Sequence, residues 1–523
     1  MLRSLVGLGL LLLSTACGAG GAVGPAKAPE ANPDEGPPGL HPVDKPVTPQ
    51  GLGEAPAGVP PVPGECTAFR GTAPASCATG DFKELLATAL TAAPTERDSL
   101  LRCLESNADA PSGLIRALRA DLAPRACGDL IVDSETKRTD QGRDVADALV
   151  GLGVGARLNR SVRQPPLPAP PFNKADFLKH FKEVLSPWIL EQARAVDALS
   201  KVGPRLSSYG KAIVALEAGL ADLRFVGVAR AINLPQEMQS DPEIRETYLV
   251  ALEEALEPRV LRGRDAALVG LGELSRLGVT RDARLTEARQ LLSALYAGRR
   301  IDALDGLLLP ALPAATQTTP ALKLAANLPA FYALRLEATP AIEDAALLRA
   351  RLEQGVPPGL WLTTLPATAS PELKALAQRA LFQLGQLYFW AEPFARASAI
   401  ETPAADTNAA VVGTVAKVLT RGPRNAAALM LGPPTLPPEL GDTKALDALA
   451  KQKGPAAGLA EFDAAYLRGL APPANDPEFW KEQRARFERA KKALADKASQ
   501  AKAAELAKAA ADTEKELRKQ PKP

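Results

Sequence analysis

Four cysteines are the residues whose types and spacing most clearly suggest chemistry: Cys66, Cys77, Cys103 and Cys127. None of them forms a C-x-x-C pair and no histidine lies near them, so we expect no zinc or other metal site. An even number of cysteines is typical of a disulfide framework in an exported protein, and the start of the chain indicates export, as argued below. We therefore predict two disulfides, with buried free thiols as the alternative.

The pairing of these cysteines depends on the helices between them, and three pairings are possible. The stretches FKELLATALTAA and ERDSLLRCLES place Leu and Ala at helical spacing and are separated by a break of turn length. If successive helices alternate in direction, Cys77 precedes the first and Cys103 ends the second at the same end of the hairpin. Cys127 opens a later helix at the opposite end from Cys103. We therefore favour Cys77 with Cys103, and Cys66 with Cys127.

Few other residues offer catalytic or cofactor chemistry. Of the two histidines, His41 lies in a proline-rich stretch that cannot hold a catalytic geometry, and His180 is expected on a helix surface. The patterns G-x-S-x-G and H-E-x-x-H are absent from the sequence. The stretch GLGVGA, which begins at Gly151, follows a helical pattern and not a strand. We interpret it as a helix C-terminus with glycine caps, not as a dinucleotide loop, and expect no cofactor.

Paired carboxylates occur on predicted helices, for example Glu253 with Glu254 and Glu343 with Asp344. Adjacent residues on a helix point in different directions, so we interpret these pairs as solvated faces. An all-α envelope enzyme with one buried glutamate, as in lytic transglycosylases, is the alternative. The sequence has none of that family's motif, and an aromatic content of 4% leaves few side chains to stack on sugar rings.

The elements that must position these residues are helices. Ala and Leu recur at three- and four-residue spacing, and no alternating β-branched run of strand length occurs. Proline-rich breaks separate a small cysteine-containing domain at 66–160, a linker at 161–172 and a main domain at 173–431. The predicted fold class is all-α, with helical hairpins in an irregular or solenoid-like array.

One hairpin of the main domain has the spacing of a known repeat. In LGQLYFWAEPFARASAI, four residues fall at the intervals of the tetratricopeptide motif: Leu384, Gly385, Tyr388 and Ala397. The segment resembles a tetratricopeptide hairpin, and the resemblance implies a helical solenoid. Because no fixed period of about 34 residues emerges, an irregular helical domain is the alternative.

The C-terminal part divides into two stretches of different composition. Residues 432–475 are proline-rich and expected to be irregular, whereas 476–523 are rich in Lys, Ala and Glu. Trp480, Phe487 and Leu494 recur every seven residues, which indicates a single solvated helix or a weak coiled coil. We expect removal of this helix to leave the melting temperature unchanged. No aromatic residue follows Phe487, so the helix lacks a row of aromatic side chains to stack on bases. The net charge of the chain is only +2, so no nucleic-acid partner is expected.

The first residues have the pattern of an export signal. Arg3 precedes an apolar run from Ser4 to Leu13 that is too short to cross a bilayer, and small residues follow up to Cys17. Residues 1–17 resemble the lipobox signal peptide of bacterial lipoproteins. The resemblance implies cleavage before Cys17 and acylation of its thiol with palmitate-type chains. Because Gly18 and not Asp follows, it also favours the outer over the inner membrane.

The next segment, 18–65, holds almost no bulky apolar residue and is rich in proline. We expect a disordered linker that reaches on the order of 100 Å from the membrane. Together these features predict a lipid-anchored protein of the bacterial cell envelope. We expect a non-enzymatic helical scaffold or protein-binding module whose partner is another envelope protein. The alternative is an envelope enzyme that cleaves glycan or peptide.

Overall fold

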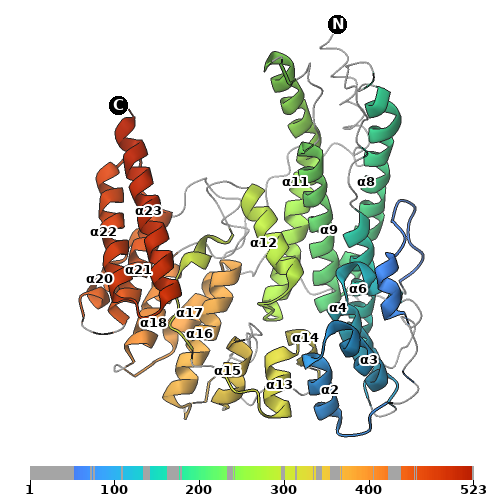
Figure 1. The fold of residues 1–523 in the computed structure, drawn as a ribbon, viewed down its shortest axis with the longest axis horizontal. Helices are drawn as coiled ribbons and strands as arrows, with labels where there is room; N and C mark the ends of the chain where they lie inside the picture. The colour runs from blue at the N-terminus through green and yellow to red at the C-terminus, as the bar shows by residue number, and fades with distance from the viewer. Residues whose placement is uncertain are drawn as a thin grey trace. The chain divides into compact units, whose positions relative to one another are not determined.

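The computed structural model describes residues 52–520 with interruptions, and every element in this described part of the chain is a helix (Figure 1). The predicted all-α class is therefore confirmed. The residues that are not described are 1–51, 71–73, 75–76, 108–109, 133–141, 162–165, 167–175, 177–178, 232–238, 241, 296–300, 313–314, 334, 337–343, 354–364, 367, 404–405, 422–437, 453, 455 and 521–523.

The contacts between residues divide the chain into two compact units. The N-terminal unit extends to Leu274 and includes Ala283–Leu291, and the C-terminal unit contains Ser275–Asp282 and everything from Leu292 onward. This division falls inside the range 173–431 that the sequence analysis treated as one domain.

The N-terminal unit begins with short helices and continues with long ones. Its elements are η1 (Gly64–Phe69), α2 (Phe82–Thr91), α3 (Pro94–Glu105), α4 (Ser112–Leu122), η2 (Arg125–Cys127), α5 (Gly128–Val132), α6 (Arg143–Ser161), η4 (Phe181–Leu185), α8 (Ser186–Ser200), η5 (Gly203–Arg205), α9 (Ser208–Arg230), most of α11 (Pro242–Arg276) and the start of α12 (Ala283–Leu295).

Glycines allow the long helices of this unit to lie unusually close together. A Cβ atom added to Gly151 of α6 would lie 2.5 Å from the Cα atom of Gly210 in α9. Likewise, a Cβ atom on Gly219 of α9 would lie 2.6 Å from the backbone nitrogen of Ala267 in α11. The stretch GLGVGA lies in the middle of α6, so the expectation of a helix C-terminus there was wrong. Its glycines serve helix packing, because any side chain at Gly151 would force the two helices apart.

The last residues of the predicted linker belong to the folded unit. Leu52 is buried, and Arg157 of α6 donates hydrogen bonds to the carbonyl oxygens of Leu52 and Gly53 at 3.2 and 2.9 Å. We call residues 52–63 the tether segment. This segment precedes η1 and is not helical, so its backbone lacks the hydrogen bonds of a helix. Side chains of α6 donate to some of its carbonyl oxygens instead. This contact shortens the linker predicted at 18–65.

The C-terminal unit continues with helices in the range where an irregular segment was expected. Its further elements are η6 (Ala303–Gly306), α13 (Pro320–Asn327), α14 (Ala330–Ala333), α15 (Ala345–Glu353), α16 (Pro371–Tyr388), α17 (Ala391–Ala399), α18 (Thr407–Leu419), η8 (Pro438–Gly441), α20 (Lys444–Ala450), α21 (Ala456–Leu470), α22 (Pro477–Ala493) and α23 (Lys497–Lys519). Most of α21 is buried, which corrects the irregular reading of 432–475.

Two helices replace the single solvated helix expected at 476–523. Asp496 accepts a hydrogen bond from the backbone N–H of Ser499 and so begins α23, which lies beside α22 (Figure 1). Phe487 and Leu494 are buried against Phe462 of α21 and alanines of α23. The hairpin thus contributes to the core, and the expectation that its removal leaves the melting temperature unchanged no longer follows.

Candidate binding site

Of the histidines and paired carboxylates considered above, His180 and Glu253 each contact a neighbouring group in the structure. Cys17 and His41 lie outside the described residues. The Nε2 atom of His180 lies 2.8 Å from a backbone carbonyl oxygen, and the side chain is half-buried. Glu253 forms an exposed ion pair with Arg230. Such contacts fix side chains at a surface, and none of them prepares an acid or base for catalysis.

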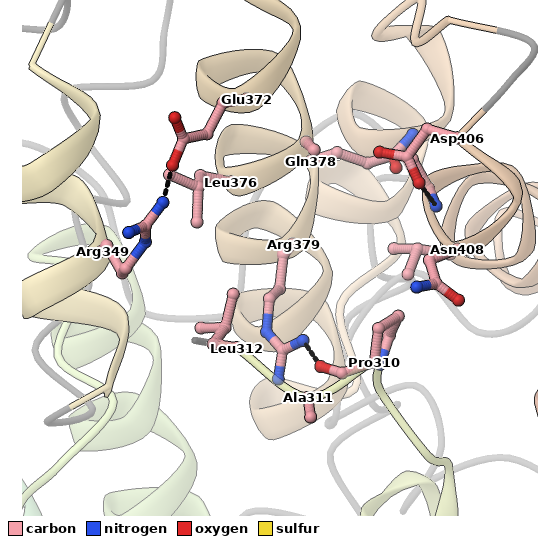
Figure 2. A pocket seen from close by; sticks show the side chains of 13 residues that line it. Pro310, Ala311, Leu312, Arg349, Glu372, Leu376, Gln378, Arg379, Asp406 and Asn408 are labelled. Atoms are coloured by element: carbon pink, nitrogen blue, oxygen red, sulfur yellow. Dashed lines mark hydrogen bonds and ion pairs between the residues drawn. The ribbon is translucent and has the colours of Figure 1, made fainter. Parts of the chain in front are cut away.

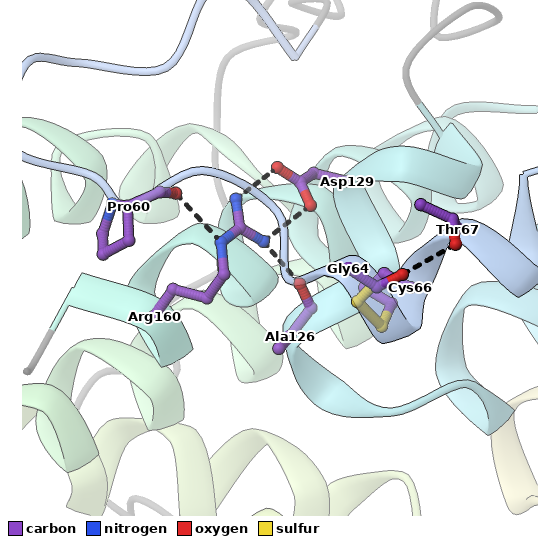
Figure 3. Close-up of a disulfide and its surroundings, with 8 residues drawn as sticks. Pro60, Gly64, Cys66, Thr67, Ala126, Asp129 and Arg160 are labelled. Carbon is purple, nitrogen blue, oxygen red and sulfur yellow. Dashed lines mark hydrogen bonds and ion pairs between the residues drawn. A yellow bond between two sulfur atoms is a disulfide. The ribbon is translucent and has the colours of Figure 1, made fainter.

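Two disulfides link the short helices of the N-terminal unit. Cys66 is paired with Cys127 and Cys77 with Cys103, with Cα–Cα distances of 5.3 and 5.4 Å. These distances lie within the usual range for a disulfide. The first bridge joins η1 to η2 (Figure 3), and both of its cysteines are fully buried. This is the pairing that the helix alternation favoured.

A buried arginine lies beside the first bridge (Figure 3). Arg160 of α6 donates to both carboxylate oxygens of Asp129, at 2.8 and 2.7 Å, and to the carbonyl oxygens of Ala126 and Pro60. One side chain therefore holds together α6, α5, η2 and the tether segment. Because its charge is matched by Asp129, the cluster is built for stability and leaves little capacity for a ligand.

A second charged cluster lies within the N-terminal unit, around Glu217 of α9. This carboxylate is 1% exposed and contacts Arg125 at 2.7 Å, Arg284 at 3.3 Å and Arg224 at 3.8 Å. Glu287 joins the cluster. Burial alone would raise its pKa, but hydrogen bonds from Arg224 and Arg125 lower the pKa of Glu287 to about 2. Glu287 therefore remains ionised at neutral pH and is not suited to donate a proton.

A cavity of about 320 Å³ lies in the C-terminal unit (Figure 2). Helices α16 and α18 and the segment before α13 supply most of its lining, and α15 contributes Arg349. The lining residues are Pro310, Ala311, Leu312, Arg349, Glu372, Ala375, Leu376, Gln378, Arg379, Asp406, Asn408, Ala409 and Val412. No sequence motif predicts this site, because its lining residues come from four separate segments.

The acids of the cavity are engaged, whereas one cation is not matched by an acid. Glu372 pairs with Arg349, and Asp406 accepts a hydrogen bond from the backbone N–H of Ala409 at the start of α18. Arg379 donates to the carbonyl oxygen of Pro310, and no carboxylate among the described residues forms an ion pair with it. Burial without a counter-charge lowers the pKa of Arg379 to about 10. Arg379 thus stays protonated at neutral pH and faces the cavity as an uncompensated charge.

Gln378 adds a buried polar group to the same cavity. Its side chain is 2% exposed, and Nε2 donates to the carbonyl oxygen of Ala397 at 3.2 Å. The Oε1 atom is buried and accepts no hydrogen bond from the described residues. A buried acceptor without a donor costs about 1 to 3 kcal/mol, so native proteins rarely keep one without a reason.

A buried acid with a raised pKa lies away from this lining. Asp463 of α21 is fully buried, and its Oδ1 accepts a hydrogen bond from the backbone N–H of Leu308 at 2.9 Å. Burial raises the pKa of Asp463 well above its ordinary value. Because this side chain fastens the segment before α13 to α21 and does not line the cavity, we interpret it as structural.

No described helix is long and apolar enough to span a membrane, and no group of three potential metal-ligating side chains occurs in the described ranges. Comparison of the chain with models of known protein families found no match, and comparisons with curated proteins and with solved structures found none either. The candidate site is therefore described by its own chemistry.

Proposed function

We propose that this chain is a lipid-anchored protein of the bacterial cell envelope that acts as a non-enzymatic helical binding module for another envelope protein. Support for the location comes from the lipobox-like signal that ends at Cys17 and from the two disulfides. Disulfides persist in oxidising compartments such as the bacterial periplasm. Gly18 favours sorting to the outer membrane.

The observation that carries the choice of binding over catalysis is the charge state of the cavity. Most glycan-cleaving enzymes use two carboxyl groups, one of them with a raised pKa beside an ionised carboxylate. Here Glu372 is paired with Arg349, Asp406 caps a helix, and the group without a counter-charge is the cation Arg379. Such a set can hold a ligand, and both of its carboxylates are already engaged by groups of the protein.

Exposed apolar side chains of the N-terminal unit support a protein partner. Val184 of η4 and three residues of α11, namely Leu249, Val250 and Leu261, are between 40% and 53% exposed. Leu249 continues the stripe of α11 that buries Leu252 and Leu256 in a small core with α8 and α9. Three large apolar side chains exposed on one helix offer contacts to a protein partner.

The anchor is tested with labelled palmitate in a bacterial host. The wild type and a Thr15→Ser variant, which keeps a small residue at that position, should incorporate label and sediment with membranes. Cys17→Ser should lose the label. Unlabelled wild-type protein would contradict the anchor.

The binding module is tested by cross-linking in intact cells, followed by solubilisation in detergent. A specific adduct should form with the wild type and with Glu254→Ala, which changes an exposed acid of the same helix. Val250→Asp should lose that adduct. If the purified protein instead cleaves cell-wall glycan or envelope peptides, and Glu372→Gln abolishes the cleavage, the enzyme alternative holds.

A further inference from the structure

The cavity of the C-terminal unit has a donor that fits a carboxylate. The Arg379 guanidinium is planar and carries several N–H groups. Within the described residues the guanidinium makes one contact, to a backbone carbonyl oxygen. The Nε atom of Arg379 is buried without a partner there. Arginine binds carboxylates through two parallel hydrogen bonds, a geometry that a single carbonyl oxygen cannot satisfy. A ligand carboxylate would supply the missing acceptors and neutralise the charge.

The adjacent residue supplies an acceptor for an N–H group. The orientation of the Gln378 amide is set by its neighbours, because Nε2 must face the carbonyl oxygen of Ala397. A Cβ atom on Gly413 would lie 2.9 Å from the same Nε2 atom, so α18 also holds the amide in place. The Oε1 atom is left buried and without a donor. A ligand N–H is the group that would satisfy it.

The rest of the lining indicates the body of the ligand. Leu376 and Val412 are buried, and Leu312 is half-buried beside them (Figure 2 labels Leu312 and Leu376). Asn408 at the rim is exposed and offers a further donor. A volume of about 320 Å³ lies at the lower end of the range for small-molecule sites. The space therefore suits one apolar side chain together with its polar ends.

We propose that this cavity binds an N-acylated α-amino acid with an apolar side chain, either free or as the C-terminal residue of a peptide. In this arrangement the carboxylate lies on Arg379, the amide N–H donates to Gln378 and the side chain contacts Leu376 and Val412. This inference goes beyond the proposed function, which names neither this cavity's ligand nor its chemistry.

Isothermal titration calorimetry on the full-length protein tests the proposal with N-acetyl-L-leucine and N-acetyl-L-leucinamide as probes. The acid should bind at least tenfold more tightly than the amide. Arg379→Gln should abolish this preference, and Gln378→Leu should weaken binding of the acid threefold or more. Arg421→Gln is the matched control, because Arg421 is exposed and paired with Asp442; it should bind like the wild type.

Two results would overturn the proposal: no binding of the acid by the wild type, or equal affinity for acid and amide. Circular dichroism checks that each variant is folded. If Arg379→Gln does not fold, two other results still test the proposal: the ratio of the wild type's affinities for acid and amide, and the affinity of the Gln378→Leu variant for the acid. A pentapeptide that ends in leucine distinguishes a peptide C-terminus from a free amino-acid derivative as the ligand. Tighter binding than N-acetyl-L-leucine indicates a peptide C-terminus, and equal binding indicates a free derivative. Failure here leaves the palmitate and cross-linking tests unaffected, because they depend on other residues.

Discussion

The charged clusters of the N-terminal unit and the cavity of the C-terminal unit treat charge in opposite ways. In the N-terminal unit, buried acids are surrounded by arginines: Glu217 contacts three, and Asp222 contacts Arg259 and Arg262. In the C-terminal unit, Arg379 has no ion-pair partner among the described residues. The clusters of the N-terminal unit thus supply their own counter-charge, whereas the cavity of the C-terminal unit does not.

This difference separates charges that hold the fold from a charge that is available for binding. Removing one partner of a buried, matched pair is strongly destabilising, because the other is left uncompensated. An unmatched charge already bears its desolvation cost, so replacing it costs little stability and removes a ligand contact. The contrast therefore predicts opposite effects of substitutions in the two units.

The largest effect is expected for Glu217→Gln. The change leaves the buried Arg284 and the half-buried Arg125 and Arg224 without their shared carboxylate. It should lower the free energy of unfolding of the N-terminal unit by about 3 to 5 kcal/mol. Glu253→Ala is the control, since its exposed pair with Arg230 should contribute less than about 1 kcal/mol. Hydrogen exchange of peptides from α9 under native conditions measures both, and equal effects of the two variants would refute the structural role of the cluster.

A similar loss in the C-terminal unit should come from apolar packing. Phe487→Ala removes a side chain that is 4% exposed and packs edge-to-face on Phe462. We expect a loss of about 3 kcal/mol or more, with faster hydrogen exchange in α21 and α23. Trp480→Ala, in the same seven-residue spacing but only half-buried, should cost less. Unchanged exchange in α21 would contradict this packing and would support the solvated helix that the sequence predicted.

Loss of the longer-range disulfide should affect only the N-terminal unit. Cys66 and Cys127 are 61 residues apart, and replacing both by serine should cost about 2 to 4 kcal/mol there. Peptide mapping without reduction identifies the two cross-linked pairs first. Exchange rates in α16 and α18 should stay the same; a general acceleration would show that the two units do not unfold separately.

Acid should weaken the N-terminal unit through Glu287. Its folded pKa of about 2 lies below the ordinary value of 4.5, so its stabilisation is present above about pH 4.5 and is lost as the pH falls toward 2. Because the group is partly exposed and screened, we expect about 1 kcal/mol. The Glu287→Gln variant should lose less stability than the wild type over this range, and parallel pH profiles would contradict the assignment.

The sequence predicted those features that depend on local pattern. Helical spacing of Leu and Ala gave the all-α class, and helix alternation favoured the pairs Cys66–Cys127 and Cys77–Cys103. It failed where distant segments meet. The role of Gly151 depends on Gly210 of another helix, and the seam of Phe487 and Leu494 is too thin to predict burial unless its partner α21 is known.

The cavity could not be predicted for the same reason. Neither Arg379 nor Gln378 belongs to a sequence motif. The property that matters is that no acid among the described residues pairs with Arg379 after folding. A buried arginine and a surface arginine look alike in a helical pattern, since both fit an amphipathic stripe. The lipid anchor at Cys17 and the tetratricopeptide resemblance remain predictions.

The most direct measurement of the contrast is the unfolding free energy of Arg379→Met, a change that keeps the length and packing of the side chain but removes its charge. Hydrogen exchange in α16 and α18 would measure it alongside Glu217→Gln. The account predicts that the C-terminal unit keeps or gains stability, by up to about 2 kcal/mol, because an uncompensated charge has been removed. A loss of more than about 2 kcal/mol would contradict it, because Arg379 would then be a structural charge like those of the N-terminal unit.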